Sequence, residues 1–201
     1  MSERRGNWMQ TAGGRAFFPL DPRPEDVHIE DIAHALSFVC RFGGHCSKFY
    51  SVAEHCVRVS LAVAAAGGSR AEALAALLHD AAEAYVGDMV WPLKQAAALA
   101  EYKAIEHGVE RAIAARFGVA FEWPIIKRFD LVLLSTEKRD LMGNDHGRRG
   151  NSPREVEAAK DRLGGWHSDA FEPLTVRIDP WFPAVARAYF LTRFDNLGGM
   201  R

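Results

Sequence analysis

One histidine and two acidic residues interrupt an apolar helical pattern in the middle of the chain. The stretch 74–85 is rich in Ala and Leu, contains no Gly or Pro, and is predicted to form one helix. His79, Asp80 and Glu83 lie among its leucines, where ionisable groups are costly unless something compensates them. A metal ion is the simplest compensation, because imidazole nitrogen and carboxylate oxygen are good ligands. The pattern predicts a metal site, with Glu83 one turn after His79 as an acid or base beside it.

Two further polar residues lie in apolar stripes elsewhere in the chain. His55 belongs to a helical stripe of valines, where a lone histidine is more often a hydrogen-bonded core residue than a ligand. Asp130 interrupts a strongly apolar run, and its alternative role is an exposed aspartate or a partner of Lys127. Together with His79 and Asp80, these residues supply two imidazoles and two carboxylates to one helical core. Helical bundles commonly build metal sites from such inward-facing side chains.

Helical spacing predicts most of the elements that must position these residues. Helices are expected over about 30–40, from Ser51 to Gly67, over 74–85, from Trp91 to Phe117 with a bend near Gly108, from Trp123 to Met142, over 154–163 and from Trp181 to Asn196. Ser51 and Ser69 are the expected N-caps of two of them. A small hairpin is predicted around Gly13-Gly14, a polar loop over 144–153 and a strand over 175–178. Because nearly every strong periodicity is helical, the predicted fold class is all-α.

The overall composition bounds the class of protein. The 201 residues carry a net charge of −1 and are 48% hydrophobic, which suits one globular domain and provides no basic field for polymeric nucleic acid. No apolar run reaches the ~20 residues that a bilayer requires, and no leader-like stretch opens the chain, so we expect a cytoplasmic protein without a membrane partner. The three cysteines are an odd number and match no paired Cys-x-x-Cys pattern, which argues against both a disulfide framework and a cysteine zinc site. We expect one domain over 1–201, with a helical core at about 30–142 and a C-terminal helical extension at 143–201.

The combined pattern resembles the HD-domain superfamily of metal-dependent phosphohydrolases. That family has a histidine, then a His-Asp pair, then a distant aspartate, which His55, His79-Asp80 and Asp130 match. The resemblance covers about residues 30–142. It implies an HD-type helical bundle in which these four residues bind one divalent cation, with Mn, Co, Ni, Fe and Zn all open as its identity.

Further sequence features resemble those of the branch of that superfamily that contains the 5′-deoxynucleotidases. A Val-Ala-Glu lead-in precedes the first histidine, and Glu83 follows the His-Asp pair by one turn. Asp88 comes directly after a glycine, and Arg41-Phe42 supplies the arginine and aromatic residue that precede the first histidine. The resemblance implies that Glu83 transfers a proton and that Asp88 orients water or completes the proton relay.

Four residues are candidates for contact with substrate. Arg41 can meet a phosphate through its bidentate guanidinium, and Lys94 is a second candidate for the same contact. His45 is another candidate for phosphate contact, and Phe42 for stacking on a sugar or base. Each has a plainer alternative, since Arg41 and His45 could be a solvated arginine and a loop histidine, and Phe42 a core residue. Some members of the resembling branch have a tryptophan where Phe42 stands, which leaves base preference open.

The expected function is hydrolysis of the phosphate ester of (deoxy)nucleoside 5′-monophosphates. Three alternatives stay open: a nucleoside triphosphate hydrolase of the same fold, a non-catalytic nucleotide-binding module, and a helical interaction protein. Glu83 and Asp88 argue against the binding module, because binding alone needs no proton-transfer residue. The expected partner is therefore a phosphorylated small molecule, and a homodimer is common in the resembling branch.

Overall fold

Helix α2 (Val52–Ala65) is the element around which the other helices pack. In the computed structural model, which describes residues 3–142 and 166–200, α2 is buried along most of its length. Ser51 caps it as predicted, since its hydroxyl accepts a hydrogen bond from the Glu54 N–H. Four helices contact α2: α1 (Ile29–Phe38), α3 (Arg70–Leu78), α7 (Pro124–Leu141) and α9 (Pro183–Asn196). Any side chain on the buried face of α2 is therefore within reach of residues from several helices.

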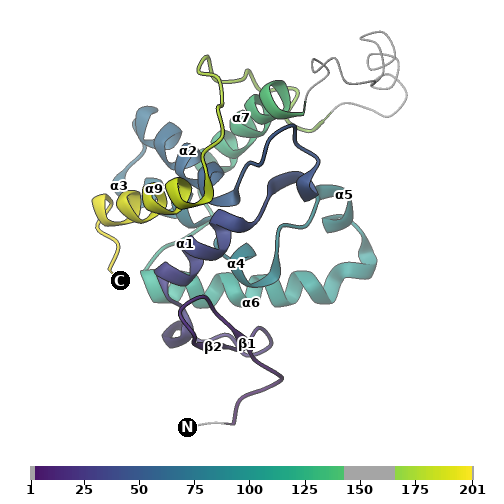
Figure 1. Cartoon of the computed structure of the whole chain (residues 1–201), viewed down its shortest axis with the longest axis vertical. Coiled ribbons are helices and arrows are strands. Elements are labelled where there is room, and N and C mark those ends of the chain that lie inside the picture. The colour runs from purple at the N-terminus through teal and green to yellow at the C-terminus, as the bar shows by residue number, and fades with distance from the viewer. Residues whose placement is uncertain (1–2, 143–165, 201) are drawn as a thin grey trace.

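The predicted all-α class is confirmed, as is the small N-terminal hairpin (Figure 1). Strands β1 (Met9–Gln10) and β2 (Ala16–Phe17) pair antiparallel at one end of the molecule. The remaining elements are short 3-10 or α-helices and one long α-helix: η1 (Pro24–Asp26), η2 (Arg41–Gly44), α4 (Glu83–Val86), α5 (Trp91–Lys94), η3 (Ala97–Leu99) and α6 (Ala100–Phe117).

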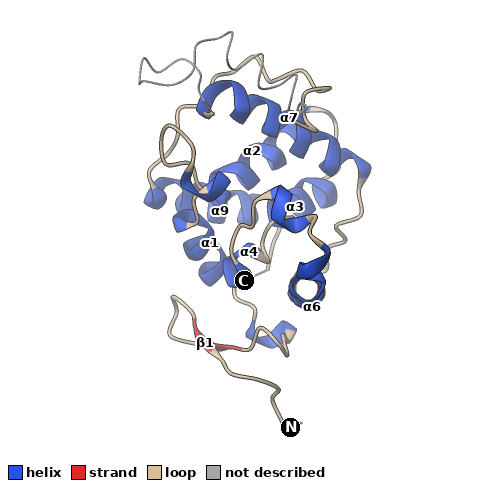
Figure 2. Ribbon diagram, turned by 90° about the vertical axis from the view of Figure 1, so that its right-hand side faces the viewer, coloured by secondary structure: helices blue, strands red, loops and turns tan. Residues whose placement is uncertain are grey.

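The helices are stacked so that α7 lies over α2 at the end opposite the hairpin (Figure 2). Helix α9 packs against α1 and α2, and its Phe190 and Phe194 are fully buried. These phenylalanines share one hydrophobic core with Leu36 of α1 and Leu77 of α3. The last helix of the chain is thus part of the core that supports α2.

The predicted helix over 74–85 is two helices, and this prediction was wrong. Helix α3 ends at Leu78, and α4 begins only at Glu83. The Nδ1 of His79 donates to the Ala76 carbonyl at 2.8 Å, and in a continuous helix that oxygen would accept from the Asp80 N–H. The chain instead tightens into three-residue turns, with Ala81 N–H to Leu78 O at 3.0 Å and Glu83 N–H to Asp80 O at 3.0 Å. The break therefore lies at the two candidate ligands themselves.

The predicted helix over 91–117 is also interrupted, although not where the sequence indicated. Pro92 lies in the first turn of α5 as expected, but α5 ends at Lys94. Helix α6 begins at Ala100 and continues through Gly108 without a break. The interruption lets the short α5 lie apart from α6 and carry Trp91 and Lys94 on its own turn.

The strand predicted over 175–178 is absent from the structure. Its backbone groups bond to side chains of α7 rather than to a neighbouring strand. Arg139 donates to the Leu174 and Val176 carbonyls at 2.6 and 3.2 Å, and the Ile178 N–H donates to Asp140 at 2.9 Å. The β-branched residues of this segment supply strand propensity, but no strand in the described part of the chain pairs with it.

Two sequence predictions fall outside the described residues: the polar loop over 144–153 and the short helix over 154–163. Within residues 3–142 and 166–200, no helix has both the length and the apolar character needed to cross a lipid bilayer.

Candidate metal centre

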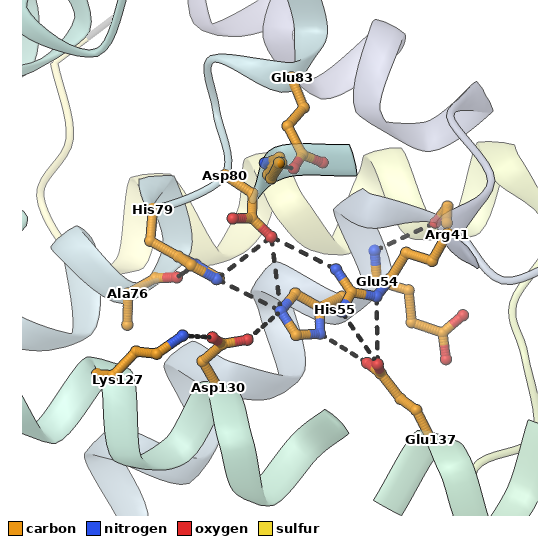
Figure 3. A network of polar contacts seen from close by, with 12 residues as sticks. Arg41, Glu54, His55, Ala76, His79, Asp80, Glu83, Lys127, Asp130 and Glu137 are labelled. Atoms are coloured by element: carbon orange, nitrogen blue, oxygen red, sulfur yellow. Dashed lines mark hydrogen bonds and ion pairs between the residues drawn. The ribbon is translucent and has the colours of Figure 1, made fainter. Parts of the chain in front are cut away.

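Three helices bring His55, His79 and Asp130 to one point (Figure 3). His55 comes from α2, His79 from the residue after α3, and Asp130 from α7. The two Nε2 atoms lie 3.4 Å apart, and His55 Nε2 lies 3.4 Å from Asp130 Oδ1. One ligand atom from each of the three residues lies within 4.8 Å of the others. Residues separated by 75 positions in the sequence thus form one cluster that could hold a metal ion.

Asp80 borders the same cluster. Its Oδ2 lies 3.3 Å from Nε2 of His79 and 3.6 Å from Nε2 of His55. Together with His79 and the buried thiol of Cys56, it also forms a second group that could hold a metal ion. All four residues predicted as ligands are therefore neighbours in space.

The hydrogen bonds of the two imidazoles fit a cation. His79 Nδ1 faces a carbonyl, which can only accept, and His55 Nδ1 lies 2.6 Å from Oε1 of Glu137. When each Nδ1 carries the proton of a neutral ring, each Nε2 presents a lone pair toward the other Nε2 and toward two carboxylates. Two ligand atoms at about 2.1 Å from one ion lie roughly 3.0–3.4 Å apart, which matches the observed 3.4 Å. The donor set and its spacing thus fit a single divalent ion.

The charged groups of the cluster shift one another's pKa values. Burial and the Arg41 charge lower the pKa of His55, but Glu137 and Asp130 outweigh them and raise this pKa to about 9, so the metal-free ring is protonated near neutral pH and a metal ion must displace the Nε2 proton. Burial opposes ionisation of Asp130, yet its contact with His55 holds the pKa of Asp130 well below the usual value. Burial also opposes ionisation of Asp80, whose pKa is lowered by the two histidines and Arg41. Both candidate carboxylates are therefore ionised and ready to bind a cation at neutral pH.

Glu137 is a further residue of the candidate site, and the sequence pattern alone does not single it out. Its side chain is fully buried, and it bonds His55 Nδ1 through one oxygen and Arg41 through the other, at 3.1 and 3.2 Å. Arg41 and His55 lower the pKa of Glu137 against the effect of burial. The available signal was its position two turns after Asp130, which places both carboxylates on one face of α7.

Arg41 reaches the cluster from η2. It is almost completely buried, and its NH1 lies 3.5 Å from Oδ2 of Asp80 while its other nitrogens bond Glu137. These carboxylates raise the pKa of Arg41 although burial opposes its charge. Arg41 is thus a permanent cation in the wall of the site rather than a solvated surface residue.

The buried Glu83 pairs with the partly exposed Lys94 beside the cluster. Lys94 Nζ lies 3.3 Å from Oε1 of Glu83 and 3.0 Å from Oε1 of Glu106. Burial and the nearby Asp80 and Asp88 raise the pKa of Glu83 well above its usual value. The second oxygen of Glu83 is buried and has no hydrogen-bond partner among the described residues. Figure 3 shows Glu83 on the Asp80 side of the site.

Asp88 lies in the turn after Gly87, whose positive φ of 82° explains the glycine that ends α4. It is half-buried, and its pKa is raised by burial and by Asp80, while the Arg41 charge opposes the rise. Asp88 is therefore electrostatically linked to the cluster.

The remaining substrate candidates lie on η2 and just after it. Phe42 is half-buried, adopts a left-handed φ of 59°, and lies 5.9 Å from the Trp166 ring, so it is at the surface rather than in the core. His45 is exposed, and no contact within the described residues joins it to the cluster. The structure thus places Arg41 and Phe42 next to the site and leaves His45 on the outer side of the turn.

Comparison with known proteins shows relatives over the whole length of the chain. No family model matches the sequence. The uncharacterised protein YfdR of Escherichia coli K12 is 34% identical over 199 residues, covering 97% of this chain and 98% of YfdR. An uncharacterised protein of Rhodobacter capsulatus is 35% identical over 200 residues, covering 94% of this chain and 95% of that protein.

Proposed function

This chain belongs to the family that includes YfdR, and we propose that it is a metal-dependent phosphohydrolase of the HD-domain type. Its proposed substrates are (deoxy)nucleoside 5′-monophosphates. The observation that carries the proposal is the convergence of two imidazole nitrogens and two carboxylates from three segments, beside a buried arginine and a buried glutamate.

His55, His79, Asp80 and Asp130 would hold one divalent ion, for which Mn, Co, Ni, Fe and Zn are the candidates. Such an ion polarises a phosphoryl oxygen and lowers the pKa of a bound water. Glu137 keeps His55 in the tautomer that presents Nε2 to the site.

Arg41 provides fixed positive charge for the phosphate. Its Nε and NH2 are held by Glu137, whereas the contact of NH1 within the described residues is a long one of 3.5 Å with Asp80. A phosphate oxygen is a better partner for NH1 than that long contact, because charge-assisted bonds of this kind are about 2.7–2.9 Å long. Lys94 adds a second positive charge near Glu83.

Glu83 is suited to donate or accept the proton of the reaction. Its raised pKa favours the protonated acid at higher pH than an ordinary glutamate would allow, and its Oε2, which has no partner among the described residues, leaves one oxygen for a substrate or water. Asp88 contributes to the raised pKa through its own charge, so the two carboxyls share the proton-handling task.

An aromatic surface beside the cluster supports a nucleotide as the substrate. Trp91 is half-exposed and stacks on His167 at 4.8 Å, and the next residue back, Trp166, lies against Phe42. Lys127, which pairs with Asp130 at 3.0 Å, lies 6.0 Å from the Trp91 ring. Aromatic rings this close to the ligands favour stacking of a planar base.

The test is phosphate release from a panel of esters with Mn, Co, Ni, Fe and Zn supplied in turn. We expect phosphate to be released from nucleoside monophosphates. Nucleoside triphosphates should remain unhydrolysed. Glu83→Gln should lower phosphate release at least 100-fold with metal content unchanged, and the exposed Glu122→Gln is the matched control. Release of triphosphate or pyrophosphate instead would favour the triphosphate hydrolase. An inactive wild type with every metal, or full activity of the Glu83 variant, would contradict the proposal.

A further inference from the structure

Two cysteines meet at the base of the turn that carries Arg41. Cys40 precedes η2 and Cys46 follows it, and their Sγ atoms lie 3.5 Å apart. Cys46 Sγ also lies 3.8 Å from the Arg41 carbonyl. The two thiols are therefore in direct contact, although they are separated by five residues.

The backbone on both sides of this pair is already held in place. The Arg41 N–H donates to the Tyr50 carbonyl at 2.9 Å, next to an isolated bridge between Cys40 and Ser51. The Ser47 N–H donates to the Leu141 carbonyl of α7 at 2.8 Å. Because a disulfide needs sulfurs about 2.05 Å apart, the remaining approach is roughly 1.5 Å and lies within the range of side-chain rotation and small backbone shifts.

The third cysteine provides a contrast within the same protein. Cys40 and Cys46 are only partly buried, whereas Cys56 is fully buried beside His79 and Asp80. A small oxidant in solvent therefore has access to the pair and is shielded from Cys56. Contact between two accessible thiols is what distinguishes a redox-sensitive pair from isolated structural cysteines.

We propose that Cys40 and Cys46 form a reversible oxidation site that a peroxide converts to an intramolecular disulfide. The Cys40 sulfur attacks one peroxide oxygen, the O–O bond breaks, and hydroxide leaves as water after taking a proton. The Cys46 sulfur then attacks the resulting sulfenic acid, the S–O bond breaks, and the thiol proton leaves with the hydroxide as a second water. Two thiols and one peroxide thus give one disulfide and two waters.

The order of the two sulfurs follows from their surroundings. Burial and the adjacent Cys40 thiol raise the pKa of Cys46 to about 11, so Cys46 remains a thiol at neutral pH and is the resolving partner. The disulfide closes a ring over residues 40–46, which contains Arg41 and the left-handed Phe42. Oxidation would therefore cross-link the two ends of the turn that carries Arg41. Formation of this disulfide does not depend on the proposed phosphohydrolase activity.

The experiment treats the full-length protein with hydrogen peroxide and then alkylates it under denaturing conditions for peptide mass mapping. We expect the peptides of Cys40 and Cys46 to be linked, two hydrogens lighter than the sum of the reduced peptides, and separated again by dithiothreitol. Cys56 should remain alkylated as a free thiol in the same sample. The link should form in Cys56→Ser but not in Cys40→Ser or Cys46→Ser.

Cys46→Ser gives a second readout that does not require the disulfide. Without its resolving partner, Cys40 should accumulate as a sulfenic acid that dimedone labels, and Cys40→Ser should show no such label at Cys46. Free thiols at both positions after peroxide treatment would overturn the proposal. Conversion to sulfinic or sulfonic acids without the link, or linkage only between two chains, would overturn it as well.

Discussion

Both ring nitrogens of His55 have close polar neighbours. Glu137 lies 2.6 Å from Nδ1, while Nε2 faces His79 and the candidate carboxylates. Because Glu137 also holds Arg41, one buried carboxylate orients a candidate metal ligand and a candidate phosphate contact. Mutation of a residue that holds a ligand in this way typically weakens metal affinity by about 10–100-fold.

Glu137→Gln should therefore weaken metal binding by about 10–100-fold, because the amide replaces a charged acceptor at His55 Nδ1 with a neutral group. Metal titration by calorimetry measures this change. The metal affinity of Glu137→Asp should lie between those of the wild type and the glutamine variant, because its charge is kept at a shorter reach.

The exposed Glu122→Gln removes the same charge away from the site and serves as the control. It should bind metal as tightly as the wild type. A Glu137→Gln variant with wild-type metal affinity would remove Glu137 from this positioning role.

At the scale of elements, helical periodicity located the main helices well. Their starts followed from capping chemistry, since Ser51 and Ser69 both cap as expected and Ser69 forms a capping box with Glu72. The break after Leu78 was not predictable from propensity, because Ala and Leu favour a continuous helix there. It arises from one side-chain contact, His79 Nδ1 to Ala76 O, which competes with a backbone bond.

The residues of the candidate site divide in the same way: those that interrupt an apolar pattern could be predicted, and those identified only by tertiary contacts could not. The four candidate ligands could be found because each polar residue interrupts an apolar stripe. Glu137 could not be separated from surface glutamates, because its partners Arg41 and His55 come from elements far away in the sequence. The aromatic contacts of Trp166 and His167 likewise depend on a chain segment that returns to the site from beyond α7.

Asp140 anchors that returning segment to α7. It accepts bonds from Arg139, from Arg177 at 2.7 Å and from the Ile178 N–H at 2.9 Å. Burial opposes its ionisation, but these partners lower its pKa to about 2. Since the folded pKa is below the unfolded value, the carboxylate stabilises the fold above about pH 4, and this contribution is lost as pH falls toward 2.

Asp140→Asn should lower the free energy of unfolding by about 2 kcal/mol at pH 7, and the difference from the wild type should shrink as the pH falls below about 4. Urea unfolding at pH 7 and pH 3 measures both effects. Asp179→Asn breaks a highly exposed ion pair with Lys48 and should change stability little at either pH. A difference at Asp140 that does not depend on pH would contradict this assignment.

At the scale of the whole molecule, the candidate metal centre joins α2, α3 and α7. A ligand that binds only the folded state stabilises it by mass action, by about 2.7 kcal/mol at 100 times its dissociation constant. For a chain of this size, thermal unfolding should shift upward by about 5–10 °C when such a metal is added to metal-free protein.

Differential scanning calorimetry with and without EDTA measures the shift. The His79→Ala variant should show no shift, because it lacks a candidate ligand that lies 3.4 Å from His55 and 3.3 Å from Asp80. An equal shift in wild type and His79→Ala would mean that the stabilising ion binds elsewhere.

The most direct measurement is the metal content of the purified, metal-saturated protein after dialysis, determined by elemental analysis for the wild type, His79→Ala and Glu83→Gln. We predict one divalent ion per chain in the wild type and in Glu83→Gln, and less than a tenth of that in His79→Ala. A full equivalent of metal retained by His79→Ala, or none bound by the wild type, would contradict the claim that these four side chains hold one cation.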